Sequence, residues 1–411
     1  MLDNQSISRF ISRKRKELGM TQAEVAEKLQ VSYQAVSKWE NGTVPNVEVL
    51  VELARLFHVS VDTLLSDGDR VTYEKANIDL VHLAALGEKI AAHLTADSRV
   101  VHKPAARTTL YDFRFSGIES PVLVTSPGWY GNKCRLAAQY GCGELAGHDI
   151  VNDLVSNVLA AGAQPLAVTD CIVTGEADEA VILPIMKGLS DACRENGCSL
   201  IGGSTLVSPH TVHKGTYTIS ASAMGVVSRE QLLDGSAIRE GDVILAVASN
   251  GLHTNGYTLI YVLMEKMPFI KKEIIAGESF LEQIMKPHVC YYPALKPLRG
   301  RADIHGMVHH SWGRRDLRLL LPKGLCAELY LNQVRPLPIF SYIKRMGNIT
   351  EHEMLSSYNC GMGMWIIAAK ESAGEIAAMI GQHFDCYPMG RIKARDGETD
   401  SVVYKGAVPW E

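Results

Sequence analysis

Residues 20–42, MTQAEVAEKLQVSYQAVSKWENG, limit the possible folds of this chain more than any other stretch. Thr21 followed three residues later by Glu24 is the pattern of a capping box at a helix N-terminus. Ser32 can cap a second short helix, and only QVS joins the two. Two short capped helices joined by so brief a turn predict a helix-turn-helix.

The remainder of residues 5–65 supplies a small core for these helices. A preceding helix is expected to end at Gly19, and helices around 47–57 and 61–65 are expected to close the bundle. Apolar residues recur at helical spacing and should share an inner face. They are Ile7, Phe10, Ile11 and Leu18 in the first helix, Val25, Ala26 and Leu29 in the second, and Ala35, Val36 and Trp39 in the third.

The pattern TQAEVAEKL, VS, VSKWENG and P resembles the Cro and phage-repressor (XRE-type) DNA-binding family over nearly the whole segment. The resemblance implies that Gln22 and the start of the third helix face a double-stranded DNA operator. A helical bundle that binds only proteins is the alternative. The candidate DNA contacts are Gln22, Tyr33, Gln34, Ser37 and Lys38.

Charge in this segment is balanced, with eight Lys or Arg and eight Asp or Glu in residues 1–65. DNA binding must therefore depend on where the charges lie, chiefly on RKRK at 13–16. One copy should bind modestly, and this favours a dimer on paired half-sites.

Composition excludes several other classes of protein. A length of 411 residues suggests about two to four domains. The net charge of −4 gives no general attraction to nucleic acid or anionic lipid. No apolar run approaches the roughly 18 residues of a membrane span, so we expect a cytoplasmic protein without a membrane partner. Nine cysteines without a CxxC pair predict buried thiols rather than disulfides or a zinc site.

From about residue 73 the pattern changes to alternating strands and helices, which predicts sheets covered by helices. Residues 121–126 and 241–249 are predicted strands, and 151–175 reads as a helix ending near Gly162 followed by a strand. PIMKGLSDACRENGCSLIGGST reads as helix, turn, strand and glycine loop. We therefore predict a multidomain chain: an all-α helix-turn-helix domain at 1–68, then an α/β lobe at 69–235 and a second at 236–411, with a short linker at 66–72.

This larger segment resembles the aminoimidazole ribonucleotide synthetase (PurM-like) family from about residue 73 to 411. The motifs, in order, are YEKANIDL, GHDIV with GAQPLAVTD, GCSLIGGST, GDVILAVASNGLHTNGYTLI, GNITEHEML and NCGMGM. The resemblance implies two α/β lobes across a cleft, with the first lobe contributing a sheet to a homodimer. It also implies ATP-dependent chemistry on a phosphoribosyl substrate, which needs magnesium held by carboxylates.

The chain departs from the family where those carboxylates belong. Gly128, Asn157 and Ser204 replace three acidic residues, whereas Lys133 is retained. The family's glycine loop in the second lobe is replaced by HHSWGRRDLRLLLP, whose bulky residues cannot let backbone approach a phosphate closely. We therefore predict no catalytic residues, no metal and no resident cofactor.

The cleft is expected to survive as a binding site for a nucleotide or phosphorylated metabolite. Basic side chains there could meet phosphate, although RRDLRLLLP also reads as a solvated helix face. Asp79, Asp149, Asp170 and Asp242 are retained, and the last three could equally be structural caps. The candidate ligand-binding residues are Lys133, Asp149, His253, Asn255, Arg314, Arg315 and Asn359.

The prediction is a transcriptional regulator with a PurM-like domain for dimerisation and small-molecule sensing. The alternatives are an ATP-dependent enzyme of altered specificity that also binds DNA, and a dimerisation scaffold without a ligand. Sequence leaves open the effector, the operator, the sign of regulation and any residual ATP hydrolysis.

Overall fold

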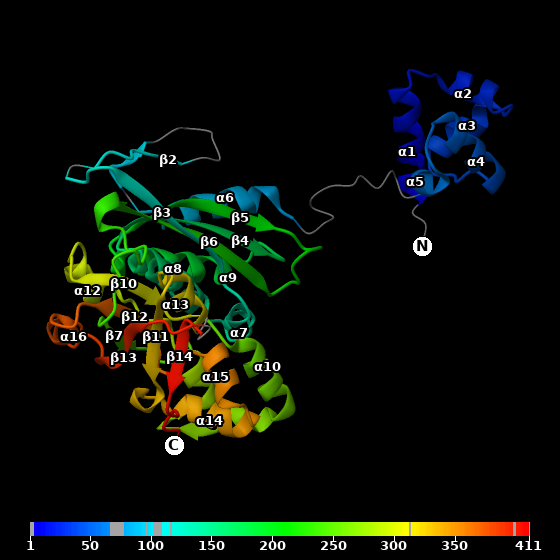
Figure 1. Cartoon of the computed structure of the whole chain (residues 1–411). Helices are drawn as coiled ribbons and strands as arrows, with labels where there is room; N and C mark the ends of the chain where they lie inside the picture. The colour runs from blue at the N-terminus through cyan, green and yellow to red at the C-terminus, as the bar shows by residue number, and fades with distance from the viewer. Residues whose placement is uncertain are drawn as a thin grey trace. The chain divides into compact units, whose positions relative to one another are not determined.

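The computed structural model describes residues 4–65, 78–95, 97–101, 109–115, 117–311, 314–397 and 400–410. The chain divides into two compact units, Met1–Asn77 and Ile78–Glu411. Figure 1 traces the chain through both units. The predicted boundary at 68/69 and the predicted linker at 66–72 lie outside the described residues. The predicted order of an all-α domain followed by two α/β lobes is confirmed.

The described residues of the first unit form five helices: α1 (Asn4–Glu17), α2 (Gln22–Lys28), α3 (Tyr33–Glu40), α4 (Val47–Leu56) and α5 (Val61–Leu65). Thr21 and Glu24 form the predicted capping box, and the Ser32 side chain accepts a hydrogen bond from the Ala35 amide. The core is Ile7, Phe10, Ile11, Val25, Ala26, Val36, Trp39, Leu50, Leu53, Ala54, Phe57 and Leu64. Leu18 was expected in this core, but it lies beyond the end of α1 and is 40% exposed.

A four-stranded sheet in the order β3-β6-β4-β5 forms the first lobe of the second unit. Its strands are β3 (Pro121–Trp129), β6 (Tyr217–Ser228), β4 (Gln164–Thr174) and β5 (Ser199–Val207). The predicted glycine loop at Gly202–Thr205 is wrong, because these residues lie within β5 and pair with Thr169–Ile172 of β4. Hydrogen bonding along the ladder outweighs the low strand propensity of adjacent glycines.

Helices α8 (Gly143–Ala160) and α9 (Glu179–Glu195) cover one face of this sheet (Figure 1). They can approach closely because residue 188 is a glycine. A Cβ at this position would lie 2.1 Å from the Glu144 carbonyl oxygen, closer than any side chain permits. Large apolar side chains of the sheet strands remain exposed, namely Leu123, Trp129 and Leu206. The short elements of this lobe are α6 (Leu80–Ala91), β1 (Val100–Val101), β2 (Leu110–Tyr111) and α7 (Lys133–Gln139).

The second lobe is built on a six-stranded sheet in the order β10-β12-β7-β13-β11-β14. Its strands are β7 (Val243–Ala248), β10 (Ile304–His309), β11 (Leu325–Tyr330), β12 (Met362–Ala368), β13 (Cys386–Ala394) and β14 (Val402–Lys405). β7 and β10 each run antiparallel to β12, which lies between them, so their carboxyl ends meet at one edge of the sheet.

Helices and short segments complete this lobe. They are α10 (Tyr257–Lys266), α11 (Phe280–Ile284), α12 (Tyr292–Leu295), α13 (Arg314–Leu320), α14 (Pro338–Gly347), α15 (Glu351–Ser357) and α16 (Ala373–Ile380), with a two-stranded ribbon of β8 (Ile274–Ile275) and β9 (Glu278–Ser279). All nine cysteines are free thiols. Among the described residues, no helix is long and apolar enough to span a membrane.

Candidate functional site

The outer face of α3 carries most of the residues expected to contact DNA. Tyr33, Gln34 and Lys38 are exposed and Ser37 is half-buried, whereas Val36 and Trp39 on the opposite face are buried in the core. Burial of one face therefore leaves these polar side chains available to a groove of DNA.

Gln22 is held against α3 rather than left free. Its Nε2 donates to Glu40 Oε2 at 2.8 Å, and Arg15 forms an ion pair with the same carboxylate at 2.5 Å. Burial alone would raise the pKa of Glu40, yet the hydrogen bonds from Arg15 and Gln22 hold the pKa below its usual value. Arg15, one of the RKRK residues on which DNA binding was expected chiefly to depend, therefore has its charge neutralised within the fold.

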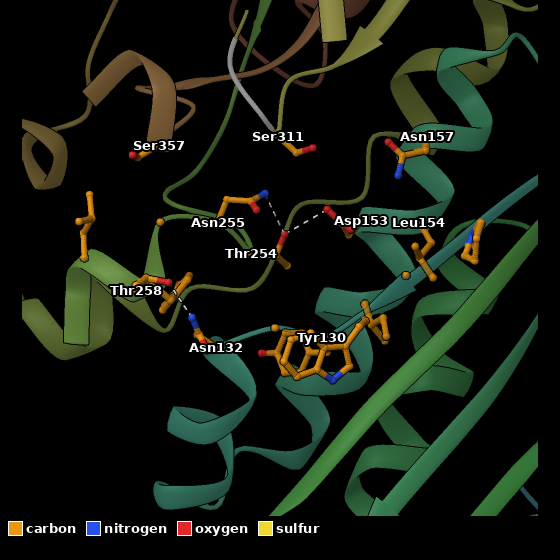
Figure 2. Close-up of a pocket in the computed structure, with 18 of the residues that line it drawn as sticks. Tyr130, Asn132, Asp153, Leu154, Asn157, Thr254, Asn255, Thr258, Ser311 and Ser357 are labelled. Atoms are coloured by element: carbon orange, nitrogen blue, oxygen red, sulfur yellow. Dashed lines mark hydrogen bonds between the residues drawn. The ribbon is translucent and has the colours of Figure 1, made fainter. Parts of the chain in front are cut away.

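A cleft of about 730 Å³ lies between the two lobes of the second unit (Figure 2). The first lobe contributes the loop after β3 and one face of α8, and the second contributes the turn before α10 and residues of α15. The polar lining residues are Asn132, Asp153, Asn157, Thr254, Asn255, Thr258, Ser311, Ser356 and Ser357, with Trp129, Tyr130 and Tyr257 as aromatic neighbours.

Two hydrogen bonds cross the cleft and join its walls. Thr254 Oγ1 donates to Asp153 Oδ1 at 3.0 Å, and Asn132 Nδ2 donates to Thr258 Oγ1 at 2.7 Å (Figure 2). Burial raises the pKa of Asp153 to about 6, against the opposing effect of the Thr254 hydrogen bond. A polar ligand entering here would compete with both bridges.

Lys133 and Asp149 form a buried ion pair beneath the cleft. Lys133 Nζ lies 2.7 Å from Asp149 Oδ2, both side chains are fully buried, and Nζ also donates to the carbonyl oxygens of His253 and Lys286. Burial lowers the pKa of Lys133 and raises that of Asp149, while their mutual attraction opposes both shifts. The structure therefore places both predicted ligand contacts in the interior, where they join the lobes.

The other predicted ligand contacts are scattered. Asn255 lines the cleft, whereas Asn359 is buried and holds a loop through Ser249 and the carbonyl oxygen of Gly251. His253 is buried behind the cleft and stacks on His288 with ring centroids 3.9 Å apart. Arg314 and Arg315 begin helix α13, and their side chains lie outside the described residues.

The retained aspartates include two with evident structural roles. Asp79 caps α6 by accepting from the amides of Val81 and His82, and Asp242 accepts from the Arg239 amide and pairs with His305 at 2.7 Å. Asp170 differs, because burial raises its pKa to about 7 and its Oδ1 has no hydrogen-bond partner among the described residues.

The three departures from the family's carboxylates leave few ligands for magnesium. Gly128 offers no side chain, and a Cβ there would lie 2.5 Å from Leu154 Cδ2. Asn157 is bonded to Ser126 Oγ and His309 Nδ1, and Ser204 is exposed on β5. Asp153 is the sole carboxylate among the described lining residues. This lining does not fit the carboxylate-rich metal and phosphate site that the family resemblance implies.

Sequence reasoning missed Asp153, Asn132, Thr254, Thr258, Ser311 and the serines of α15. A signal existed on α8, because Asp153 lies four residues after Asp149 and four before Asn157, which is the spacing of one helix face. The serines and threonines carry no comparable signal, since only the packing of the two lobes brings them together.

Comparison with known proteins gives three family matches. The chain matches the family described as helix-turn-helix over residues 11–64, the N-terminal domain of AIR synthase related proteins over 123–227, and their C-terminal domain over 239–403. A phosphoribosylformylglycinamidine cyclo-ligase of Methylobacillus flagellatus is 31% identical over 355 residues, which cover 82% of this chain and 99% of the relative. The same enzyme of Streptococcus sanguinis is 29% identical, over 81% of this chain and 98% of the relative.

Solved structures share the fold of the larger unit. E. coli HypE has a TM-score of 0.57 at 13% identity, covering 79% of this chain and 94% of HypE. A thiamine-monophosphate kinase from Stenotrophomonas maltophilia has a TM-score of 0.55 at 19% identity, covering 79% of this chain and 96% of the kinase. At such low identity these likenesses concern the fold alone.

Proposed function

Because this chain belongs to the AIR synthase related protein family and begins with a helix-turn-helix domain, we propose that it is a DNA-binding transcriptional regulator. The AIR synthase related module dimerises it and senses a small molecule. The proposal includes a cytoplasmic location, where such a regulator meets the chromosome. The observation that carries it is the capped helix pair α2 and α3, which presents Gln34 and Lys38 on an exposed polar face.

Loss of the family reaction is the second part of the proposal. It rests on Gly128, Asn157 and Ser204, which supply no carboxylate for the metal that phosphoryl transfer requires. Purified protein given ATP, magnesium and formylglycinamidine ribonucleotide should form no aminoimidazole ribonucleotide above the rate without protein. Turnover on the order of 1 per second or faster would show that the chain is an active enzyme and would contradict this part of the proposal.

Dimerisation is supported by the sheet of the first lobe. Helices α8 and α9 cover one face, while Leu123, Trp129 and Leu206 remain 51%, 63% and 54% exposed. These side chains lie on β3 and β5, the two edge strands of the sheet, and exposed large apolar side chains are a feature of protein interfaces. We propose that a second copy of this chain covers Leu123 and Leu206, whereas Trp129 lines the cleft and is left to the ligand.

The effector proposed is a nucleotide or another phosphorylated metabolite. The described cleft lining offers amides and hydroxyls, which suit a base or sugar, and Trp129 offers an aromatic face for stacking. Lys133 does not line the cleft, and phosphate contacts by Arg314 and Arg315 stay a prediction, because their side chains lie outside the described residues.

Selection of DNA by the full-length protein tests the proposal directly. A random duplex library bound at fixed salt should yield one enriched, palindromic sequence, and a thermal-shift screen of nucleotides should yield a stabilising compound. That compound should change the affinity for the selected duplex. If no DNA sequence is enriched, the proposal of a transcriptional regulator is contradicted. Enrichment of a sequence without any stabilising compound supports the dimerisation scaffold without a ligand. Magnesium-dependent ATP hydrolysis supports the enzyme alternative.

A further inference from the structure

Three histidines converge behind the cleft on a point that no other part of the proposed function uses. His253 follows β7, His288 lies between α11 and α12, and His309 ends β10. All three side chains are buried, and one ring nitrogen from each lies within 4.8 Å of the other two. The meeting of the carboxyl ends of β7 and β10 at one sheet edge accounts for the approach of His253 and His309.

The hydrogen bonds of the His288 and His309 rings leave two acceptor nitrogens facing each other. His288 Nδ1 lies 2.8 Å from the Val289 carbonyl oxygen, and His309 Nδ1 lies 3.0 Å from Asn157 Oδ1. Each Nδ1 that faces an oxygen must carry the proton and donate it, so each Nε2 is left with a lone pair. The two Nε2 atoms nevertheless face each other at 3.0 Å. Two lone pairs at this distance repel unless a positive charge lies between them.

The third ring adds an unsatisfied nitrogen. His253 Nε2 is buried and has no hydrogen-bond partner among the described residues. The residue has a left-handed backbone conformation, with φ +57°, which histidine adopts more readily than most residues. A buried polar nitrogen without a hydrogen-bond partner is typical of a site that binds an ion or a ligand.

We propose that His253, His288 and His309 bind a divalent transition-metal ion of the zinc class. Neutral imidazoles are ligands for such ions, and zinc–nitrogen bonds of about 2.0–2.1 Å place two ligand nitrogens roughly 3.3–3.5 Å apart. The separation of 3.0 Å between the Nε2 atoms of His288 and His309 is close to that geometry. Three protein ligands leave a fourth position for water or an anion.

The surroundings supply the support that metal-binding histidines usually have. The carbonyl oxygen of Val289 and the amide oxygen of Asn157 orient the two rings from behind, as outer ligands do in zinc sites. Asn157 also lines the cleft (Figure 2), so the ion would lie one side chain away from a bound effector.

Zinc titration of the full-length, tag-free protein after dialysis against a chelator tests this site. We expect one zinc ion per chain, measured by competition with a chromophoric chelator, and visible absorption bands of tetrahedral cobalt when Co²⁺ is used instead. His288→Gln should weaken zinc binding at least roughly 100-fold. His305→Gln, which alters a buried histidine paired with Asp242 outside the cluster, should leave zinc affinity unchanged.

The opposing explanation is that the Asn157 amide is rotated, so that Nδ2 donates to His309 and the two imidazoles share an ordinary hydrogen bond. Asn157→Asp separates the two, because a carboxylate can only accept and therefore keeps the proton on His309 Nδ1. This position is solvent-exposed, so the variant is expected to fold even if His288→Gln does not. Tighter zinc binding by Asn157→Asp supports the site if it is lost again when His288→Gln is added, because a carboxylate that bound zinc by itself would not need His288. The absence of stoichiometric zinc overturns the site. Equal zinc affinity in the wild type, His288→Gln and Asn157→Asp also overturns it.

Discussion

Asp153 is the residue whose protonation should be most visible in solution. It lies on the cleft wall, accepts a hydrogen bond from Thr254, and has its pKa raised by burial to about 6 from an ordinary value of 3.8. The folded protein therefore holds this proton more tightly than the unfolded chain. Its contribution to stability is present below about pH 4 and is lost as the pH rises through about 6.

Asp153→Asn should accordingly stabilise the protein at pH 8 and have little effect at pH 4. A tenfold change in proton affinity corresponds to about 1.4 kcal/mol, so a pKa raised from 3.8 to about 6 predicts a gain of about 3 kcal/mol at pH 8. The asparagine keeps an oxygen that can accept from Thr254. Urea unfolding at the two pH values measures the difference, and Glu119→Gln, at an exposed carboxylate, serves as the control. An equal gain at both pH values would show that the carboxylate is not the cause.

Residue identity alone could not show where the charged groups of the site point. Lys133 and Asp149 were predicted to bind a ligand, but only three-dimensional packing reveals that they are buried and neutralise each other. The same holds for Arg15 and Glu40, which are 25 positions apart and meet only when α1 packs on α3.

At the scale of elements, local chemistry was the better guide. Caps, turns and apolar spacing predicted α2, α3, β3, β7 and the helix that ends before Gly162, because each depends on neighbours in sequence. β5 was misjudged at its glycines, since the ladder to β4 comes from distant residues. Helix α3 is the element on which the DNA-binding proposal depends most.

Replacing Gln34 and Lys38 by alanine should abolish specific DNA binding and leave the fold intact. Each specific base contact contributes roughly 1–3 kcal/mol, so the double variant should lose about 30-fold or more in affinity for the selected duplex. Gel shift at fixed salt measures the loss. Arg55→Ala removes one positive charge from exposed α4 and is the matched control. If the two variants lose affinity equally, binding follows net charge rather than the face of α3.

At the scale of the whole molecule, one helix-turn-helix with balanced charge should bind weakly, and pairing through the larger unit should provide affinity. A two-fold dimer on DNA requires two half-sites whose centres lie about 34 Å, or one helical turn, apart. Linking two weak contacts multiplies their effect because the second binds within the same complex.

Residues 1–68 alone should therefore bind a half-site weakly and ignore the effector, whereas the full chain should be a dimer that binds tightly and responds. The shorter chain is expected to fold because the first unit has its own core. Sedimentation and gel shift on both chains measure this. A monomeric full-length protein, or a short chain with full affinity, is incompatible with the proposal.

The contact between position 128 and Leu154 couples these two positions. Leu154 Cδ2 occupies the space that a Cβ at position 128 would need, at 2.5 Å. Because this methyl group is the end of a flexible side chain, a side chain introduced at position 128 requires Leu154 to change its rotamer rather than the backbone to move. Substitutions at positions 128 and 154 should therefore have non-additive effects on the free energy of unfolding.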